Sequence, residues 1–418
     1  MHPNAPSASL LPVIMGGDFG VYGIGRSFNE AFGCRCLCVA NQPIEAITKS
    51  NFFDVVTIDA GISDDDRLAV LKGIAAAHPD KALVLMANTD VHSAFIARNS
   101  QALQACGYAT PFPSIDVIEG LTDKAAFAQA CGRLGIDTPG TVVVDFSQAT
   151  DQDWRAPEIP FDFPVVAKAA RGDAYDAIEF EGKRKIWFME SQDELDSLWE
   201  SLKAAGFEDL FLVQELIPGD NTAMRSITAY VDSTGKVALI GSARVLLEDH
   251  APTMIGNPVA MITETFEHLW EQASKLLTES GYRGFANFDI KIDPRDGRAM
   301  FFEVNPRIGR NNWYMSAAGA NPMKVMVADL IDHRQVEPVQ AREEILYSMV
   351  PDRLLLRYLR EDGLRSRVRE LIRSGKRFDP LLNPAEKNPY RNAIVRLQKL
   401  NHYRKFRRYY PEATDKSF

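Results

Sequence analysis

The stretch at residues 285–312, FANFDIKIDPRDGRAMFFEVNPRIGRNN, constrains the fold of this 418-residue chain more than any other. Its apolar side chains at positions 288, 290 and 292 alternate with charged ones, PRDG is typical of a turn, and an apolar run follows at 300–304. This pattern predicts two neighbouring strands around a tight turn. Opposed side chains of such a hairpin lie within a few ångströms of each other.

The hairpin carries oxygen ligands where they would meet. We expect Asp289 and Glu303 on neighbouring strands, with Asn305 on the same face as Glu303. Two carboxylates and an amide oxygen suit Mg²⁺ or Mn²⁺. Arg307 and Arg310 follow at once, and guanidinium groups suit phosphate or carboxylate oxygens. The alternative is an edge hairpin whose acidic side chains are simply solvated.

Length and composition are those of a globular protein. The chain could hold two or three domains, with 46% hydrophobic and 25% charged residues. No apolar run is long enough to span a bilayer, and MHPNAPSASL lacks the features of a signal peptide, so we expect a cytoplasmic protein. Five cysteines without a metal or redox spacing agree with this expectation.

The N-terminal region predicts a parallel α/β sheet. Residues 11–40 read as a strand, a glycine-rich turn, a helix over 24–32 and a second strand, and further strands are expected at 54–59 and 82–90 around a helix at 64–77. The glycine spacing is not that of a dinucleotide site. A substrate carboxylate near the helix start is an alternative, with Arg26 as a candidate ligand.

Three further segments carry candidate residues. A capped helix is expected from Lys124, in TDKAAFAQACGRLGIDTP, and a buried-strand pattern, FPVVAKA, contains Lys168, whose ammonium requires an anion. The strand in FLVQELIPGDN ends at a Pro-Gly turn. Two more strands are expected at 226–231 and 237–245, with Arg225 at the start of the first and Arg244 in the second. We expect an irregular substrate loop at 246–263.

Taken in this order, the four segments resemble the ATP-grasp superfamily. The resemblance implies ATP as cofactor, with Asp289, Glu303 and Asn305 holding two magnesium ions (or Mn²⁺) and Arg307 touching phosphate or the acyl intermediate. It further implies a helix closing the domain at 325–331 and a lid over the phosphates at ARGDAYDA, which departs from the usual form in having one glycine, Gly172. The remaining implied ligands are Lys124 and Lys168 for phosphates, Gln214, Glu215 and Ile217 for adenine, Asp220 for ribose, and Arg244 near the γ-phosphate.

Within the superfamily, GGDFGVYGIGRSFNEAFG and EVNPRIGRNN are most similar to carboxylate–amine ligases related to D-aspartate ligase. This resemblance covers about residues 11–335 and implies Arg310 and Asn311 as ligands of the substrate carboxylate. We therefore expect an ATP-dependent enzyme that activates a carboxylate, such as that of an amino acid, as an acylphosphate and joins it to an amine. Such small molecules are the expected partners, in cell-wall precursor synthesis or elsewhere.

The expected fold is α/β, with an N-terminal Rossmann-like pre-ATP-grasp domain at 1–118, a two-lobed ATP-grasp domain at 119–335 and a helical basic extension at 336–418.

From residue 351 onward the chain has 18 Lys and Arg against 8 Asp and Glu, a net charge of +10 that leaves −19 for the rest. Such a tail suits nucleic acid or an anionic membrane. We favour a third interpretation, a basic helix packed on the acidic body, at the active site or in a homodimer interface.

Two other functions stay open at this point. The first is a nucleotide sensor or scaffold without catalysis, which the altered lid favours and the complete ligand set disfavours. The second is a nucleic-acid-associated ATPase that uses the basic tail.

Overall fold

The computed structural model describes residues 10–151, 153–170, 174–175, 177–184, 186–251 and 254–414. Arg171 and Gly172 of the expected lid lie outside these residues. The chain divides into two compact units, the first made of residues 1–119, 219–290 and 304–418, and the second of residues 120–218 and 291–303. The three domains expected from the sequence were taken from the family resemblance, whereas the two units are defined by contacts within the structure. The three-domain division therefore stays a prediction.

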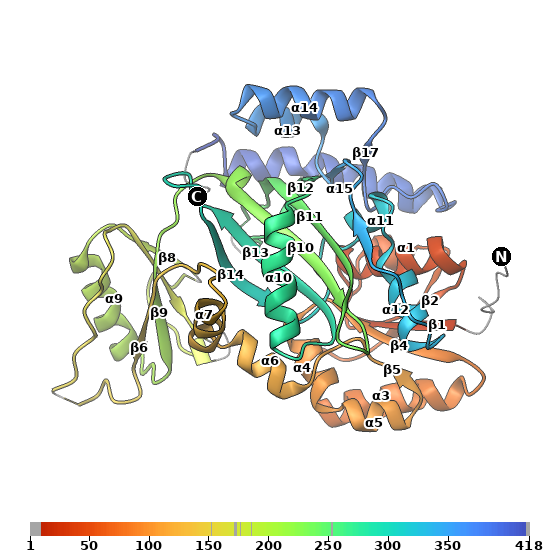
Figure 1. The fold of residues 1–418 in the computed structure, drawn as a ribbon, viewed down its shortest axis with the longest axis horizontal. Coiled ribbons are helices and arrows are strands. Elements are labelled where there is room, and N and C mark those ends of the chain that lie inside the picture. The colour runs from red at the N-terminus through yellow and green to blue at the C-terminus, as the bar shows by residue number, and fades with distance from the viewer. Residues whose placement is uncertain are drawn as a thin grey trace. The chain divides into compact units, whose positions relative to one another are not determined.

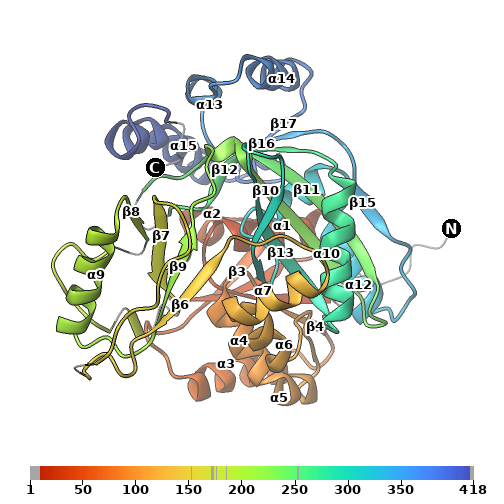
Figure 2. The ribbon, with the colours of Figure 1, turned by 60° about the vertical axis from the view of Figure 1, so that its left-hand side comes forward.

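The N-terminal part of the first unit is a five-stranded parallel sheet in the order β3-β2-β1-β4-β5, as the alternating strand and helix patterns predicted. Helices α3 to α5 gather below this sheet in Figure 2, and α1 and α2 lie above it. The elements are β1 (Leu10–Met15), α1 (Phe19–Phe32), β2 (Cys36–Ala40), α2 (Glu45–Thr48), β3 (Phe53–Thr57), α3 (Asp64–Ala77), β4 (Ala82–Ala87), α4 (Asp90–Arg98), α5 (Ser100–Ala105), β5 (Tyr108–Ala109) and α6 (Ile115–Thr122).

Helix α1 starts five residues earlier than predicted because Asp18 caps it. The Asp18 carboxylate accepts hydrogen bonds from the amides of Gly20 and Val21, and Gly33 ends the helix with a φ of 64°. The glycine-rich turn therefore continues directly into the helix, and its first amides already have a carboxylate partner.

A larger mixed sheet fills the rest of the first unit, in the order β14-β13-β10-β11-β12-β16-β17, with β15 paired to β11. Helix α10 crosses the strands of this sheet (Figure 1). The elements are η1 (Asn221–Ala223), β10 (Met224–Val231), β11 (Val237–Glu248), β12 (Pro258–Thr263), α10 (Glu267–Glu279), β13 (Gly284–Ile292), β14 (Ala299–Asn305), α11 (Trp313–Ala317), α12 (Pro322–Leu330), β15 (Val339–Ala341) and β16 (Leu346–Ser348).

The prediction of an irregular loop at 246–263 is wrong in part. Strand β11 continues to Glu248, and Pro258–Thr263 forms β12, antiparallel to it. The small side chains of this stretch pack inside the sheet, where Val259 is 4% exposed and Ala260 is fully buried, so their size reflects packing and not irregular structure.

The main core of the first unit lies between the two sheets. It combines residues of β1, α1 and β2 with residues of β10, β11, α11 and α12, and includes the fully buried rings of Phe28 and Tyr22. Gly284 shows how closely the segments meet, because its φ is 85° and a Cβ there would lie 2.2 Å from the carbonyl oxygen of Pro111. Only glycine fits at the start of β13.

The C-terminal region packs against the rest of the first unit, which confirms the packing that the favoured interpretation of the basic tail predicted; a place at the active site or in a homodimer stays a prediction. Its elements are α13 (Asp352–Tyr358), α14 (Asp362–Arg373), β17 (Arg377–Phe378) and α15 (Pro389–Tyr409). Helices α13 and α14 and the end of α15 share a hydrophobic cluster with β11, β12 and β16. The tail is therefore part of the core of this unit.

The second unit is built on a four-stranded sheet in the order β6-β9-β7-β8, with all pairs antiparallel. Its core contains a cluster of aromatic rings around Phe146 and Phe211. The elements are α7 (Lys124–Arg133), β6 (Thr141–Asp145), β7 (Val165–Ala169), β8 (Trp187–Met189), α9 (Gln192–Ala204) and β9 (Leu210–Glu215), and residues 291–303 of β13 and β14 complete it.

No helix among the described residues is long and apolar enough to cross a membrane.

Candidate active site

In the first unit, Asp289, Asn305 and Arg307 form a chain of polar contacts at the β13 and β14 hairpin. Asn305 donates from Nδ2 to Asp289 Oδ2 at 3.0 Å, and Arg307 Nη2 donates to Asn305 Oδ1 at 3.0 Å. Arg307 Nε also lies 3.2 Å from Asp90 Oδ1. The predicted proximity of Asp289 and Asn305 is therefore present, with the cation of Arg307 beside them.

In the second unit, Glu303 of β14 pairs with Lys124 at the first position of α7. Lys124 Nζ lies 2.7 Å from Glu303 Oε2 and donates to the carbonyl of Phe302 at 3.2 Å. Asp123 caps this helix through the amide of Ala126, as the sequence predicted. The structure thus brings together the first predicted phosphate lysine and a predicted metal ligand.

The donor atoms on this hairpin suit a hard divalent cation. Asp289 and Glu303 supply carboxylate oxygens and Asn305 an amide oxygen, which is the ligand chemistry of Mg²⁺. Among the described residues, no cluster of three or more His, Cys, Asp or Glu side chains meets the geometry of a metal site.

Lys168 lies on β7 of the second unit, in register with Leu212 of β9. Its side chain is partly buried between neighbours that are mostly apolar. A lysine in such a position is stable when an anionic or hydrogen-bonding partner is near.

The predicted adenine segment runs along β9 and beyond it. Gln214 is 9% exposed and donates from Nε2 to Thr141 Oγ1 at 2.9 Å, and Ile217 is 2% exposed. Glu215 Oε1 lies 2.7 Å from Arg295 Nη2, and its amide donates to the carbonyl of Gly140. Arg295 was not predicted, and its hydrogen bonds to Asp293 hold the pKa of that carboxyl below its usual range.

Asp220 and Arg244 lie near one another in the first unit, around η1. Asp220 Oδ1 accepts from the amide and hydroxyl of Thr222, and Arg244 Nε donates to the carbonyl of Thr222 at 3.0 Å. Arg244 Nη2 also lies 3.0 Å from Glu361 Oε2, a contact from the C-terminal region that the sequence analysis did not foresee.

Arg225 faces Arg244 directly in the β10 and β11 register. Burial and the neighbouring charge of Arg244 lower the pKa of Arg225 to about 10. Its guanidinium lies 4.9 Å from the ring centre of Phe266 and donates to the carbonyls of Thr222 and Met224. Two arginines held side by side create a local positive potential that favours an anion.

Arg310 joins the glycine-rich turn to the segment before β12. Its Nε donates to Asp18 Oδ2 at 2.7 Å and its Nη1 donates to Asn257 Oδ1 at 2.9 Å. A Cβ on Gly20 would lie 2.8 Å from the carbonyl oxygen of Arg310. The turn therefore needs glycine so that the Arg310 backbone can approach it, and neither Asp18 nor Asn257 was predicted.

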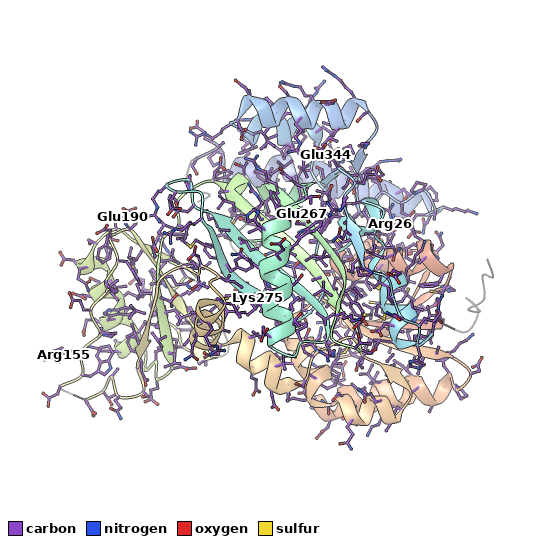
Figure 3. The ribbon with its side chains drawn as sticks, viewed as in Figure 1. Arg26, Arg155, Glu190, Glu267, Lys275 and Glu344 are labelled. Carbon is purple, nitrogen blue, oxygen red and sulfur yellow. The ribbon has the colours of Figure 1, made fainter. Side chains whose placement is uncertain are left out.

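Asn311 and Arg26, the other predicted substrate ligands, have different surroundings. Asn311 Oδ1 accepts from the Tyr347 hydroxyl at 3.3 Å. Arg26, labelled in Figure 3, is 5% exposed, lies 3.5 Å above the ring of Trp313 and donates to the carbonyls of Asp379 and Pro380. The contacts with Asp379 and Pro380 connect α1 to the C-terminal region, whereas Trp313 belongs to α11.

The partners that sequence reasoning missed come from distant parts of the chain. Asp18 is 292 residues from Arg310, and Glu361 is 117 residues from Arg244. Only the glycine pattern around Gly20 signalled that another segment approaches closely.

Known proteins resemble this chain in sequence and in fold. Residues 123–330 match the family model described as "Carbamoyl-phosphate synthase L chain, ATP binding domain". The chain is 28% identical to a D-aspartate ligase of Enterococcus faecium over 418 aligned residues, which covers 98% of this chain and 99% of that protein. The similarity therefore extends through the C-terminal region, beyond the 11–335 that the sequence analysis recognised.

Two solved structures share the fold. An L-amino acid ligase from Bacillus licheniformis superposes with a TM-score of 0.52 at 16% identity, covering 77% of this chain and 74% of that one. The biotin carboxylase domain of Hydrogenobacter thermophilus 2-oxoglutarate carboxylase, a dimer solved with the magnesium salt of ADP and bicarbonate, gives 0.54 at 16% identity, covering 78% and 71%. Together with the family match, these similarities show that the chain has an ATP-grasp fold, as the sequence predicted.

Proposed function

We propose that this protein uses ATP to activate the carboxylate of a small amino acid and joins the resulting acyl group to an amine, with release of ADP and phosphate. Two observations carry this proposal: the polar chain of Asp289, Asn305 and Arg307 in the first unit, and the pair of Glu303 and Lys124 in the second. They combine cation ligands with cations suited to phosphate, which is what phosphoryl transfer requires.

Each residue has a proposed role. Lys124 and Lys168 bind phosphate oxygens of ATP, and Arg307 and Arg244 neutralise charge that develops on the transferred group. Asp289, Glu303 and Asn305 would hold Mg²⁺, which bridges phosphate oxygens and neutralises their charge. Gln214, Glu215 and Ile217 contact the base and Asp220 the ribose.

The carboxylate of the acid substrate is proposed to bind at Arg310 and Asn311. Arg310 is oriented from both sides, by Asp18 and Asn257, so its guanidinium has a fixed direction. Arg26 is left out of the proposed site because its Nη1 donates to backbone carbonyls of the C-terminal region and its Nε donates to Glu30.

For the acid itself, D-aspartate is the first candidate, since the relative that matches this chain from end to end is a D-aspartate ligase. The amine of a lysine-containing cell-wall precursor is the matching candidate acceptor.

The test is phosphate release from ATP and Mg²⁺ across D- and L-amino acids, each alone and with amine acceptors that include a lysine-ended stem peptide. We expect release that requires one acid and one amine. Glu303→Gln removes a proposed cation ligand and should lower kcat by roughly 100-fold or more.

The matched control is Glu279→Gln, an exposed glutamate on α10 in the other unit, which should leave the rate unchanged. ATP binding without turnover for any pair would instead indicate a nucleotide sensor. Turnover stimulated by nucleic acid alone would indicate the ATPase alternative.

A further inference from the structure

The outer face of α15 is unusual among the described residues. Eight large hydrophobic side chains are more than about a third exposed, and five of them lie on this single helix of 21 residues: Tyr390, Leu397, Leu400, Tyr403 and Tyr409. Isolated exposed hydrophobic residues are ordinary, but a concentration of them marks an interaction surface.

The same helix is strongly basic. It contains five arginines and two lysines and no acidic residue. Lys399 and Lys405 pair with the buried carboxylates of Asp379 and Asp249, and Arg391 is fully buried. The remaining four, Arg396, Arg404, Arg407 and Arg408, are exposed.

Most of the exposed leucine, tyrosine and arginine side chains share one side of the helix, and Tyr409 at its end does not. Leu397, Leu400, Arg404 and Arg407 follow at spacings of three, four and three, and Arg396, Leu400, Tyr403 and Arg407 at four, three and four, which places both rows along one face. Val395 and Phe406, 2% and 1% exposed, anchor the opposite side in the protein. The outer face therefore interleaves leucine and tyrosine with arginine.

We propose that this face, defined by Tyr390, Arg396, Leu397, Leu400, Tyr403, Arg404, Arg407 and Arg408, docks the protein on an anionic lipid surface. A helix lying in the plane of a membrane buries leucine and tyrosine at the level of the headgroups, while arginine side chains reach the lipid phosphates. The charge on the face complements an anionic bilayer, and attraction adds with each arginine.

The other occupants fit less well. Two copies of α15 meeting across a two-fold axis would bring four arginines of each copy against four of the other, which is repulsive. Leu397 and Leu400 lie in the middle of the face, 65% and 56% exposed, where a nucleic acid backbone has no apolar group to cover them.

The experiment is sedimentation of the full-length protein with vesicles of phosphatidylglycerol mixed with phosphatidylcholine, and with vesicles of phosphatidylcholine alone. We expect binding to the anionic vesicles only, weakening as salt is raised. Replacing Arg396, Arg404, Arg407 and Arg408 with Gln should reduce partitioning by about fivefold for each arginine. The pair Leu397→Ser and Leu400→Ser should reduce it at least about tenfold.

The matched control replaces four exposed cations elsewhere in the first unit, Lys72, Lys236, Lys324 and Arg334, with Gln, and should retain binding. All variants keep the buried face of α15, so thermal unfolding should be unchanged. The proposal would be overturned by equal binding to both vesicle types or by an equal loss of binding in the control. It would also be overturned by binding of an oligonucleotide without binding of vesicles, or by a dimer that the leucine variants dissociate. The test needs no catalytic activity, so it is independent of the proposed ligase reaction.

Discussion

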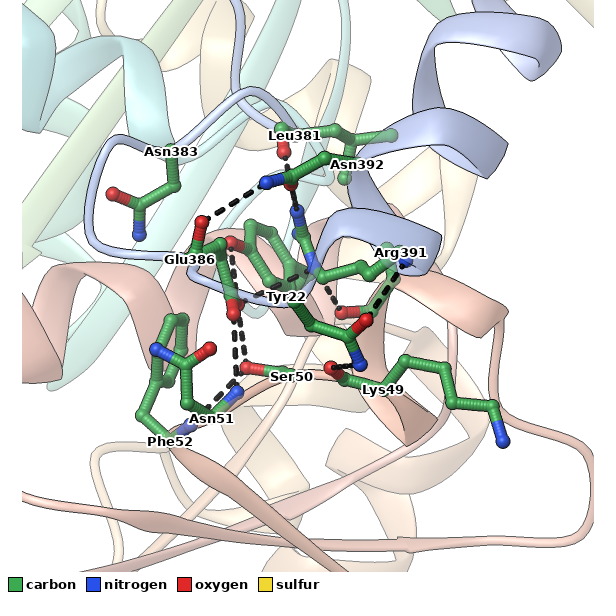
Figure 4. A network of polar contacts seen from close by, with 12 residues as sticks. Tyr22, Lys49, Ser50, Asn51, Phe52, Leu381, Asn383, Glu386, Arg391 and Asn392 are labelled. Carbon is green, nitrogen blue, oxygen red and sulfur yellow. Dashed lines mark hydrogen bonds and ion pairs between the residues drawn. The ribbon is translucent and has the colours of Figure 1, made fainter.

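Arg391 has the largest fully buried side chain among the described residues and illustrates what holds the C-terminal region in place. Its guanidinium donates to the carbonyls of Ala46 and Leu381 and lies 3.4 Å from Glu386 Oε1. Figure 4 shows the same carboxylate accepting from Tyr22, Ser50 and the amide of Asn51. A buried charge with this many partners is stable only while all of them remain.

Breaking this network should therefore be costly. Arg391→Met leaves the Glu386 carboxylate buried without its cation, and we expect the free energy of unfolding to fall by about 3 to 5 kcal/mol. Urea denaturation measures the change as a lower midpoint at unchanged slope. Arg396→Met on the exposed face of the same helix is the control, and an equal effect in both variants would refute a specific role for the network.

The candidate ligands of the site could be predicted from the sequence, but the residues that contact the site arginines could not. The oxygen ligands and lysines stand in recognisable segments, so Asp289, Glu303 and Lys168 could be proposed from local pattern. Asp18, Asn257 and Glu361 could not, because each contacts an arginine far away in the chain and nothing in the local sequence records it.

At the scale of elements, the alternation of strand and helix patterns predicted the parallel sheet. The alternation of apolar and charged residues around a turn predicted the hairpin, and both are present. Strand β12 was missed because its run of small and apolar residues, PVAMIT, has the composition of a loop as well as of a buried strand. The packing of α15 was a favoured interpretation only, since its basic composition fits a solvated helix equally well.

The packing of α15 has a consequence for acid stability. The His250 ring stacks on Tyr410 with centroids 3.6 Å apart and interacts with Asn221 Oδ1, while His402 lies on α15 itself. Burial lowers the pKa of both histidines to about 4, from about 6.5 in an unfolded chain. Between these values the unfolded chain binds more protons than the folded one.

The free energy of unfolding should therefore decrease as the pH falls from about 6.5 toward about 4, by up to about 1.4 kcal/mol per pH unit for each histidine. Above pH 6.5 the two groups should have no effect. Urea midpoints across this range measure the slope, and the double variant His250→Asn, His402→Leu should reduce it relative to the unchanged protein. An identical slope in the variant would contradict the assignment.

At the scale of the whole molecule, the similarity to one relative extends over nearly the whole chain. The sequence resemblance stopped near residue 335, whereas the similarity to the E. faecium D-aspartate ligase covers 98% of the chain. The C-terminal region belongs with the rest, because it supplies Glu361 to Arg244 and its buried Arg391 to the N-terminal sheet layer. What these similarities leave open is the identity of the acid and the amine in the proposed reaction.

The central claim is that the γ-phosphoryl group of ATP is transferred to a substrate carboxylate, and the path of oxygen tests it most directly. With the acid labelled by ¹⁸O in its carboxylate, attack of the amine on the acylphosphate must leave one labelled oxygen on the phosphate that departs. We predict one ¹⁸O in each phosphate released, detected by mass spectrometry, and release that is slower by roughly 100-fold or more in Glu303→Gln. Phosphate without label would mean that water or another group receives the phosphoryl, and would contradict the account.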